Sequence, residues 1–191
     1  MFTRAIRPAV TLLLLMTLLL GIVYPLTITG IAKLAFPHQA AGSLVERDGK
    51  AVGSTLIGQG FTSPKYFWGR PSATAPQVYN GAASAGSNLG PLNPALLDSV
   101  KSRAQALRDA DPGNAQPIPV ELVTASASGL DPDISPAAAR YQAARVARAR
   151  GLAPARVEAL IAAHVQQRLL GLFGEPRLNV LELNLALDGL H

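Results

Sequence analysis

The fold of this chain is decided by PAVTLLLLMTLLLGIVYPLTITGIA, residues 8–32, an uncharged apolar stretch between Arg7 and Lys33. A helix of this length rises by about 1.5 Å per residue and reaches roughly 37 Å. The hydrocarbon core of a bilayer is about 30 Å thick, so such a helix can cross it with some tilt. The stretch therefore predicts one membrane-spanning helix, over residues 8–34.

A cleaved secretory signal is the competing interpretation, because Arg4 and Arg7 precede the apolar run as a positively charged n-region would. The run is longer than the usual apolar region of about 7 to 15 residues, and no small-residue cleavage motif follows it promptly. Both features favour a retained anchor. Pro25 is expected to kink the helix, and the hydroxyls of Thr27 and Thr29 can bond to the backbone groups that it frees.

The basic residues on the two sides of the span predict its orientation. Arg4 and Arg7 crowd a tail at residues 1–7, whereas the basic residues that follow the span are more dispersed. Short flanks retain positive charge in the cytoplasm, and long domains cross the membrane largely regardless of charge. We therefore expect a cytoplasmic tail at 1–7 and an extracytoplasmic domain at 35–191.

The composition limits what this domain can be. The chain has no cysteine, so an extracytoplasmic domain must be held together by core packing or by partners. The formal net charge is +5, with 17 Lys and Arg against 12 Asp and Glu. An extracytoplasmic location argues against nucleic acid as the partner, and it favours acidic lipid headgroups or an acidic protein face.

The pattern after the span predicts one α+β domain, because strands and helices are interleaved. Three helices are expected from caps and prolines at their starts, over 94–110, 136–150 and 154–173. A hairpin is expected over 43–57 with its turn at Asp48-Gly49, and single strands over 118–124 and 181–187. The third helix is predicted to bury one apolar face: Val157, Leu160, Ile161, Val165, Leu169 and Leu172.

Residues 61–90 form an irregular segment that holds most of the aromatic residues of the domain among Gly, Pro, Ser and Asn. Trp, Tyr and Arg dominate the energetics of protein interfaces. We therefore predict a partner-facing surface at Tyr66, Trp68 and Arg70, together with Asn88 in the glycine-rich loop that follows. Closure of the core is the alternative for the aromatic residues.

Several motifs are suggestive of chemistry and have simpler interpretations. The glycines from Gly53 to Gly60 have phosphate-loop spacing, but Gln59 stands where that loop needs lysine. The histidines have no ligand-like spacing, so no metal site is expected. Asp131 and Asp133 lie in a turn, where aspartate is common. The arginines of the second helix are predicted to form a solvated face. No catalytic constellation emerges from these residues.

Six ordered segments resemble one family over nearly the whole chain. They are LIGQ (56–59), YFWGRPSA (66–73), GSNLGPLNP (86–94), LVTASASGLDPDISP (122–136), QAARVARARGL (142–152) and GEPRLNVLELNLALD (174–188). Together they are similar to the small C subunit of the Kdp potassium-transporting P-type ATPase. Departures are slight, and Asp133, which stands where histidine is common in the family, is one of them.

The resemblance implies an accessory, non-catalytic subunit in a bacterial inner membrane. Its implied partners are a channel-like potassium-binding subunit and a P-type subunit that hydrolyses ATP. It also implies a catalytic chaperone that raises the ATP affinity of the pump subunit, with nucleotide contact at Gln142 and Arg145. A domain outside the membrane cannot meet cytosolic ATP, so the predicted orientation conflicts with direct contact. The orientation is the better-founded of the two expectations.

Two other functions stay open at this point. One is a membrane-anchored extracytoplasmic hydrolase that uses the Asp131 and Asp133 pair or the serines Ser126 and Ser128. Such an enzyme needs a base near its nucleophile, and no histidine lies in either loop. The other is a free-standing envelope-binding module that acts through the aromatic segment.

Overall fold

The structure is a computed structural model that describes residues 2–190. Met1 and His191, the ends of the predicted tail and domain, lie outside this range. The chain divides into two compact units between Leu44 and Val45. Helices and small sheets are mixed in the second unit, which confirms the predicted α+β class.

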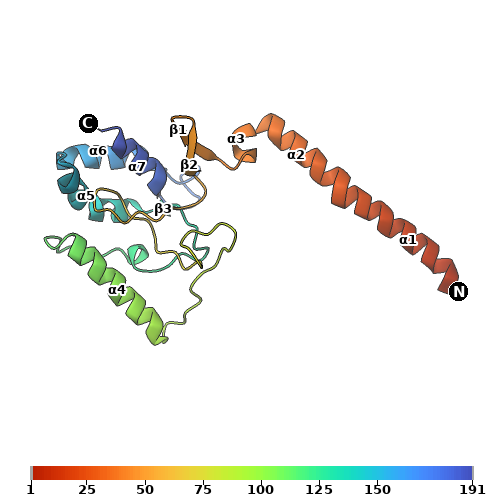
Figure 1. Ribbon diagram of the computed structural model, residues 1–191, viewed down its shortest axis with the longest axis horizontal. Helices are drawn as coiled ribbons and strands as arrows, with labels where there is room; N and C mark the ends of the chain where they lie inside the picture. The colour runs from red at the N-terminus through yellow and green to blue at the C-terminus, as the bar shows by residue number, and fades with distance from the viewer. Residues whose placement is uncertain (1, 191) are drawn as a thin grey trace. The chain divides into compact units, whose positions relative to one another are not determined.

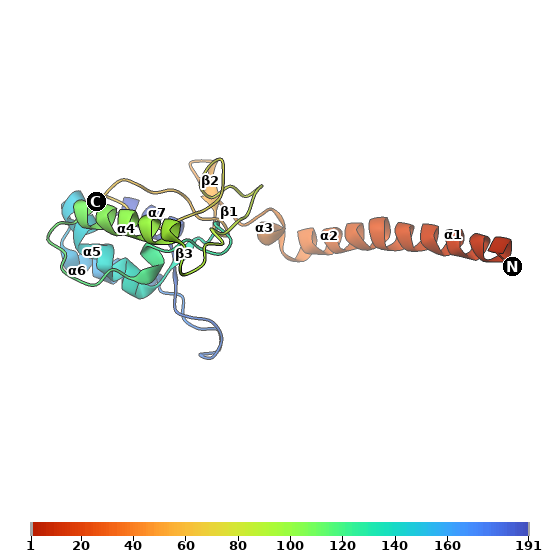
Figure 2. The same ribbon diagram turned by 90° about the horizontal axis from the view of Figure 1, so that it is seen from below.

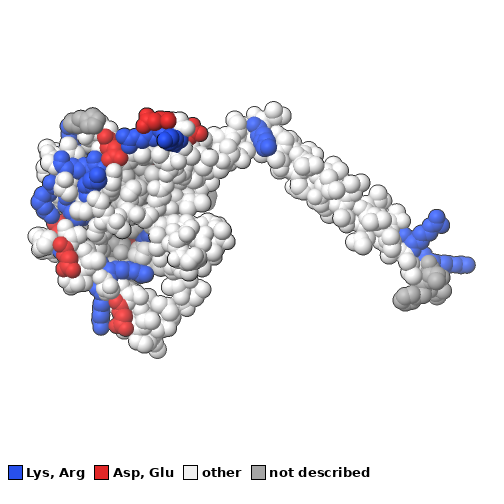
Figure 3. All heavy atoms as spheres, viewed as in Figure 1, with Lys and Arg blue, Asp and Glu red and all other residues white. Residues whose placement is uncertain are grey.

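The first unit is a long helix built from three successive segments (Figure 1). They are α1 (Phe2–Leu18), the π-helical turn η1 (Leu19–Val23) and α2 (Tyr24–Ala35), and the short helix α3 (Pro37–Ala40) follows. The part from Arg4 to Ala35 is long and apolar enough to cross a membrane, with a mean hydropathy of 2.3. Figure 3 shows this helix free of charged residues between the basic side chains near its two ends.

The irregularity predicted at Pro25 takes the form of the π-helical turn just before it. Proline lacks the N–H that would pair with the carbonyl one turn earlier, so regular hydrogen bonding is interrupted there. Thr27 Oγ1 donates to Val23 O at 2.8 Å. Val23 lies only two residues before Pro25, whereas the carbonyl that the proline leaves without a backbone donor lies about one turn before it, so the role expected of the threonine hydroxyls stays a prediction.

The predicted hairpin follows α3 along the chain. Strand β1 (Leu44–Arg47) pairs with β2 (Lys50–Ser54). Asp48 and Gly49 connect them with φ of 54° and 73°, as a type I′ turn requires. The hairpin turn is therefore confirmed, although β2 ends three residues earlier than expected.

The starts of three helices are also confirmed. These helices are α4 (Pro94–Ala110), α5 (Pro136–Arg150) and α6 (Pro154–His164). The side chain of Asn93 caps α4 by accepting from Ala95 N at 3.0 Å, and that of Ser135 caps α5 by accepting from Ala138 N at 3.1 Å. Helix α5 ends at Gly151, which has a φ of 66°. Helix α5 packs against α6, and α6 packs against α7 (Val180–Asp188).

The third predicted helix ends about nine residues early. Helix α6 stops at His164, and the chain then forms a narrow loop in which Gln166 and Arg177 exchange backbone hydrogen bonds of 2.8 and 3.1 Å. Leu170 and Gly171 in this loop adopt positive φ, which a right-handed helix excludes. Val157 and Ile161 are buried as predicted, but Leu169 and Leu172 are exposed.

The predicted final strand is wrong, because residues 180–188 form helix α7. Its apolar residues are frequent enough to satisfy both periods, and Val180, Leu183 and Leu187 lie on one buried helical face. Asn179 selects the helix by accepting from Glu182 N at 3.1 Å as an N-terminal cap.

The predicted strand at 118–124 is also wrong, because a single 3₁₀ turn, η2 (Val120–Leu122), occupies it. Pro117 and Pro119 have no N–H to donate to a neighbouring strand. Thr124 N and Thr124 Oγ1 both bond back to Val120 O, which closes the turn.

The core surrounds α5. Ala138, Val146 and Ala147 on α5 are buried against Val157 and Ile161 of α6. A two-residue antiparallel ladder adds β3 (Asp133–Ile134) to β4 (Leu178–Asn179), with Ile134 opposite Leu178. Phe67 is fully buried in the same cluster, so the irregular aromatic segment is part of the core.

Candidate functional site

Two buried side-chain amides hold the aromatic segment in place. Asn184 on α7 accepts from Phe67 N at 2.8 Å and donates to Phe67 O at 2.9 Å. Gln142 on α5 does the same to the next residue, accepting from Trp68 N at 2.8 Å and donating to Trp68 O at 3.1 Å. Each amide satisfies both backbone groups of one residue, so Phe67 and Trp68 enter the core with their backbone N–H and C=O groups paired.

Arg145 supports the same segment from α5. Its guanidinium donates to Gln142 Oε1 at 2.7 Å and to Pro64 O at 2.6 Å, and its Cζ lies 4.3 Å from the centre of the Trp68 ring. The residue is only 3% exposed, and burial lowers its pKa to about 10. Arg145 therefore stays charged at neutral pH, compensated by carbonyl oxygens and a π face.

This finding corrects the prediction of a solvated basic face on α5 for Arg145 and Arg150, whereas Arg140 and Arg148 are exposed as predicted. Besides the buried Arg145, Arg148 donates to Asp111 at 2.5 Å and Arg150 donates to Asp188 at 2.6 Å. Asp188 also accepts from Tyr66 and Arg47, so it joins the hairpin, the aromatic segment and two helices. The arginines of α5 mostly hold neighbouring segments together.

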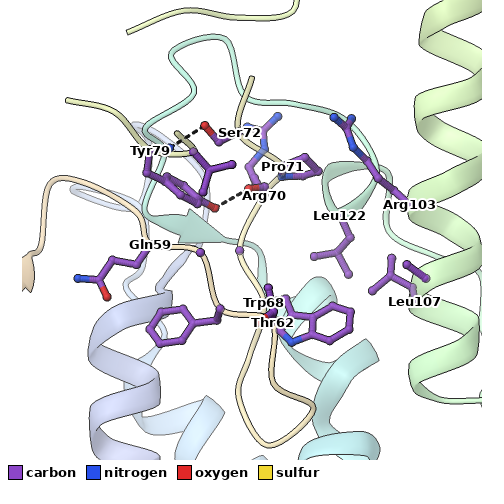
Figure 4. A pocket seen from close by; sticks show the side chains of 15 residues that line it. Gln59, Thr62, Trp68, Arg70, Pro71, Ser72, Tyr79, Arg103, Leu107 and Leu122 are labelled. Atoms are coloured by element: carbon purple, nitrogen blue, oxygen red, sulfur yellow. Dashed lines mark hydrogen bonds between the residues drawn. The ribbon is translucent and has the colours of Figure 1, made fainter. Parts of the chain in front are cut away.

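A pocket of about 250 Å³ opens beside the clamped segment (Figure 4). Helix α4 contributes Arg103, Ala106 and Leu107 to its wall. The remaining walls come from η2 and from the irregular segment: Gln59, Gly60, Phe61, Thr62, Trp68, Gly69, Arg70, Pro71, Ser72, Val78, Tyr79 and Leu122. The lining is largely apolar, and its charged residues are Arg70 and Arg103. Such a pocket fits apolar side chains or a small apolar molecule.

Tyr79 shapes one side of the pocket. Its hydroxyl donates to Arg70 O at 2.5 Å, and its backbone N donates to Ser72 Oγ at 2.9 Å. Burial is the main cause that raises its pKa to about 12, so the hydroxyl remains a donor. The ring lies on Gly58, where an added Cβ would be 2.4 Å from Tyr79 Cε1. Close packing of the Tyr79 ring therefore explains why residue 58 is a glycine, without any role in binding phosphate.

The two candidate catalytic aspartates are both engaged in ion pairs. Asp131 accepts from Arg70 at 3.0 Å, and Asp133 accepts from Arg177 at 2.9 Å. Burial raises the pKa of Asp133, while the Arg177 charge lowers it. Ser128 Oγ accepts from Leu130 N in a turn, and Ser126 is buried. Within residues 2–190, no three His, Cys, Asp or Glu residues are grouped as metal ligands.

The structure separates the four residues predicted to face a partner. Trp68 and Arg70 both line the pocket. Tyr66 lies elsewhere, with its hydroxyl on Asp188 and its ring 5.4 Å from that of Phe61. Asn88 is exposed with a φ of 52° and is not among the pocket-lining residues.

The two residues expected to contact nucleotide lie together on α5. Gln142 is 1% exposed and Arg145 is 3% exposed. Their polar groups bond to Trp68, Pro64 and each other.

Asn184 and Tyr79 were not identified as site residues by the sequence analysis. Asn184 had one available signal, since it is a lone amide among leucines in an apolar stretch. Once that stretch is read with a helical period, Asn184 falls on the buried face and requires a polar partner. Tyr79 gave no such signal, because its role depends on close packing against Gly58 and Gly69, which are distant from it in the sequence.

The fold and the site define a class of protein: a domain that follows a candidate membrane span and offers an open apolar pocket fixed by buried polar clamps. Comparison with known families gives the more specific assignment. The chain belongs to the family described as K+-transporting ATPase, c chain (KdpC), whose model matches residues 6–189.

Curated relatives named "Potassium-transporting ATPase KdpC subunit" are similar over almost their full length. The protein from Variovorax paradoxus is 69% identical over 97% of this chain and 96% of its own. Those from Polaromonas naphthalenivorans and Sorangium cellulosum are 66% and 65% identical, over 97% and 96% of this chain and 94% and 97% of their own.

Proposed function

We propose that this chain is an accessory, non-catalytic subunit of an ATP-driven potassium uptake complex. Family membership carries the proposal, and a domain with a candidate span suits a subunit of a membrane complex. The partners proposed are a channel-like potassium-binding subunit and a P-type subunit that hydrolyses ATP. The ion pairs of Asp131 and Asp133 disfavour a hydrolase.

The pocket beside Trp68 is the proposed contact with a partner subunit. An interface of this kind typically places apolar side chains of one protein in a preformed apolar hollow of the other. Trp68 and Arg70 remain the proposed anchoring residues, and Val78 contributes an exposed side chain to the lining. Tyr66 and Asn88 belong to the same surface only if the partner extends beyond the pocket.

We propose that the chain raises the ATP affinity of the pump subunit through contact with its partners. The burial of Gln142 and Arg145, and the use of their polar groups inside the domain, support an indirect effect. Two proteins coupled in this way change each other's ligand affinity by factors of about 5 to 150.

Co-purification and kinetics test the function. Val78→Asp places a charge at the pocket, and we expect recovery of the complex to fall at least about tenfold, the effect of a 1.4 kcal/mol penalty. Omission of the chain from the reconstituted complex should raise the KM for ATP of potassium-dependent hydrolysis. Val120→Asp is the matched control, because Val120 is also an exposed valine and does not line the pocket.

Normal recovery of the complex with Val78→Asp would show that the pocket does not contact a partner subunit. An unchanged KM for ATP without the chain would contradict the chaperone role. Cross-linking of a photoactivatable ATP to this chain in the assembled complex would establish direct contact instead.

We further propose that the domain lies outside the cytoplasm of a bacterial cell, with Arg4 and Arg7 inside. An alkaline phosphatase fused after His191 should then be active, because this enzyme requires an oxidising compartment for its disulfides. The same reporter fused after Arg7 is the control and should be inactive. Activity of a cytoplasmic reporter fused after His191 would reverse the orientation.

A further inference from the structure

The loop between α6 and β4 ends in an apolar tip, defined here as Leu169, Leu170, Leu172 and Phe173. Their exposed fractions are 68%, 81%, 76% and 65%, although buried positions exist for such residues in a domain of this size. Figure 2 shows the loop extending away from the helices of the domain. A cluster of large apolar side chains on a projecting segment indicates contact with another apolar phase.

Four backbone N–H groups in and beside the tip are hydrogen-bonded within the loop. Leu169 and Phe173 exchange hydrogen bonds of 2.9 and 3.0 Å, Leu172 N donates to Leu169 O at 3.1 Å, and Gly171 N donates to Arg168 O at 3.1 Å. Within an apolar medium, each unsatisfied backbone group would be costly, so a self-bonded turn is the form that can enter one.

Charge is confined to the base of the loop. Residues 169–174 carry no charged side chain. Arg168 pairs with Glu175 at 2.5 Å on the two arms just behind the tip, and Arg177 pairs with Asp133 further back. An apolar tip with an arginine at its base matches the boundary between acyl chains and phosphate headgroups, where long basic side chains extend toward the polar layer.

A bilayer is the apolar phase that this chain always has nearby. The stretch from Ala35 to Val45 is ten residues, which span at most about 36 Å when fully extended, so the second unit is tethered close to the membrane surface. Tethering raises the effective concentration of a weak second contact. We propose that the apolar tip inserts into the interfacial layer of the bilayer that holds the candidate span. The inference rests on the proposed membrane anchoring, and it holds for either orientation of the domain.

The absence of native cysteine allows the test to be made on the full chain. Leu172→Cys, labelled with an environment-sensitive fluorophore, is reconstituted into vesicles of phosphatidylcholine and phosphatidylglycerol. We expect a shift of emission to shorter wavelength and loss of fluorescence when the lipids carry a nitroxide quencher on the acyl chain. Leu92→Cys is the matched control, because Leu92 is 94% exposed and lies outside the tip. Its label should respond to aqueous iodide instead.

A second variant separates insertion from other contacts. Adding Leu170→Asp and Phe173→Asp to Leu172→Cys should abolish quenching by lipid while the chain still floats with the vesicles. For Leu172→Cys without the two Asp substitutions, a label that is quenched only by iodide on chains that still float would overturn the insertion and leave the anchor intact. If the chains do not float with the vesicles, both the proposed membrane anchoring and the proposed insertion of the tip are overturned. Protection of the label only when partner subunits are added would assign the tip to a protein interface.

Discussion

Asn184→Leu is expected to lower the free energy of unfolding by about 4 kcal/mol, because it leaves two buried backbone groups without partners. Asn184 satisfies both Phe67 N and Phe67 O from a position that is 2% exposed. An unsatisfied buried polar group costs about 1 to 3 kcal/mol, and two are created at once. Leucine repeats the branching of the asparagine side chain and leaves no cavity, so the loss of these bonds dominates the result.

Thermal unfolding of the full chain, followed by circular dichroism in detergent, measures this effect. For a domain of this size we expect the Tm to fall by roughly 10 °C. Gln105→Leu is the control, since Gln105 is exposed on α4 and its side chain bonds to Asp109 in the same helix. A Tm within about 2 °C of the parent would show that the amide does not hold the aromatic segment.

Gly58→Ala is the second substitution with a large expected effect, about 3 kcal/mol of destabilisation. The added Cβ would lie 2.4 Å from Tyr79 Cε1 and 2.7 Å from Asp131 O. The carbonyl belongs to a backbone that Gly58 N already ties down through Leu130 O at 2.8 Å, so neither neighbour can move freely. Overpacking at such a site typically costs 1 to 3 kcal/mol, and this one forces two shifts at once.

Urea unfolding of the full chain measures the loss, and the emission of Trp68 reports on the pocket wall in the same experiment. Gly90→Ala is the control because, among the described residues, no atom lies within 4 Å of its added Cβ. That variant should unfold at the same urea concentration as the parent or slightly higher. Equal midpoints for Gly58→Ala and Gly90→Ala would show that Tyr79 can move away at little cost.

Local signals in the sequence were sufficient for several elements. The uncharged stretch at 8–32, the caps Asn93 and Ser135, and the turn Asp48-Gly49 each act within a few residues. Their chemistry is complete without any distant partner: a capping side chain bonds to its own helix, and an aspartate-glycine pair adopts positive φ by itself. For this reason the span, the helix starts and the hairpin turn could be predicted.

Elements whose apolar pattern fits two structures could not be predicted this way. The leucines after Asn179 fit a strand and a helix equally, and only burial against α6 with the Asn179 cap favours the helix. The stripe from Val157 to Leu172 has one helical period, but only its first half meets a core. The spacing of apolar residues indicates which of them share a face of a helix or strand. It does not indicate whether another element of the fold covers that face.

The sequence by itself predicted the candidate membrane span and the α+β class, because length, charge and local hydrogen bonding decide these. The partner-facing role of the aromatic segment stays a prediction. Only the tertiary structure decided that Gln142, Arg145 and Asn184 hold that segment, and that Trp68 and Arg70 share a pocket while Tyr66 does not. The bonds of Asn184 to Phe67 join residues 117 positions apart. A polar side chain is buried where a distant backbone supplies its partner, and that partner exists only after the chain has folded.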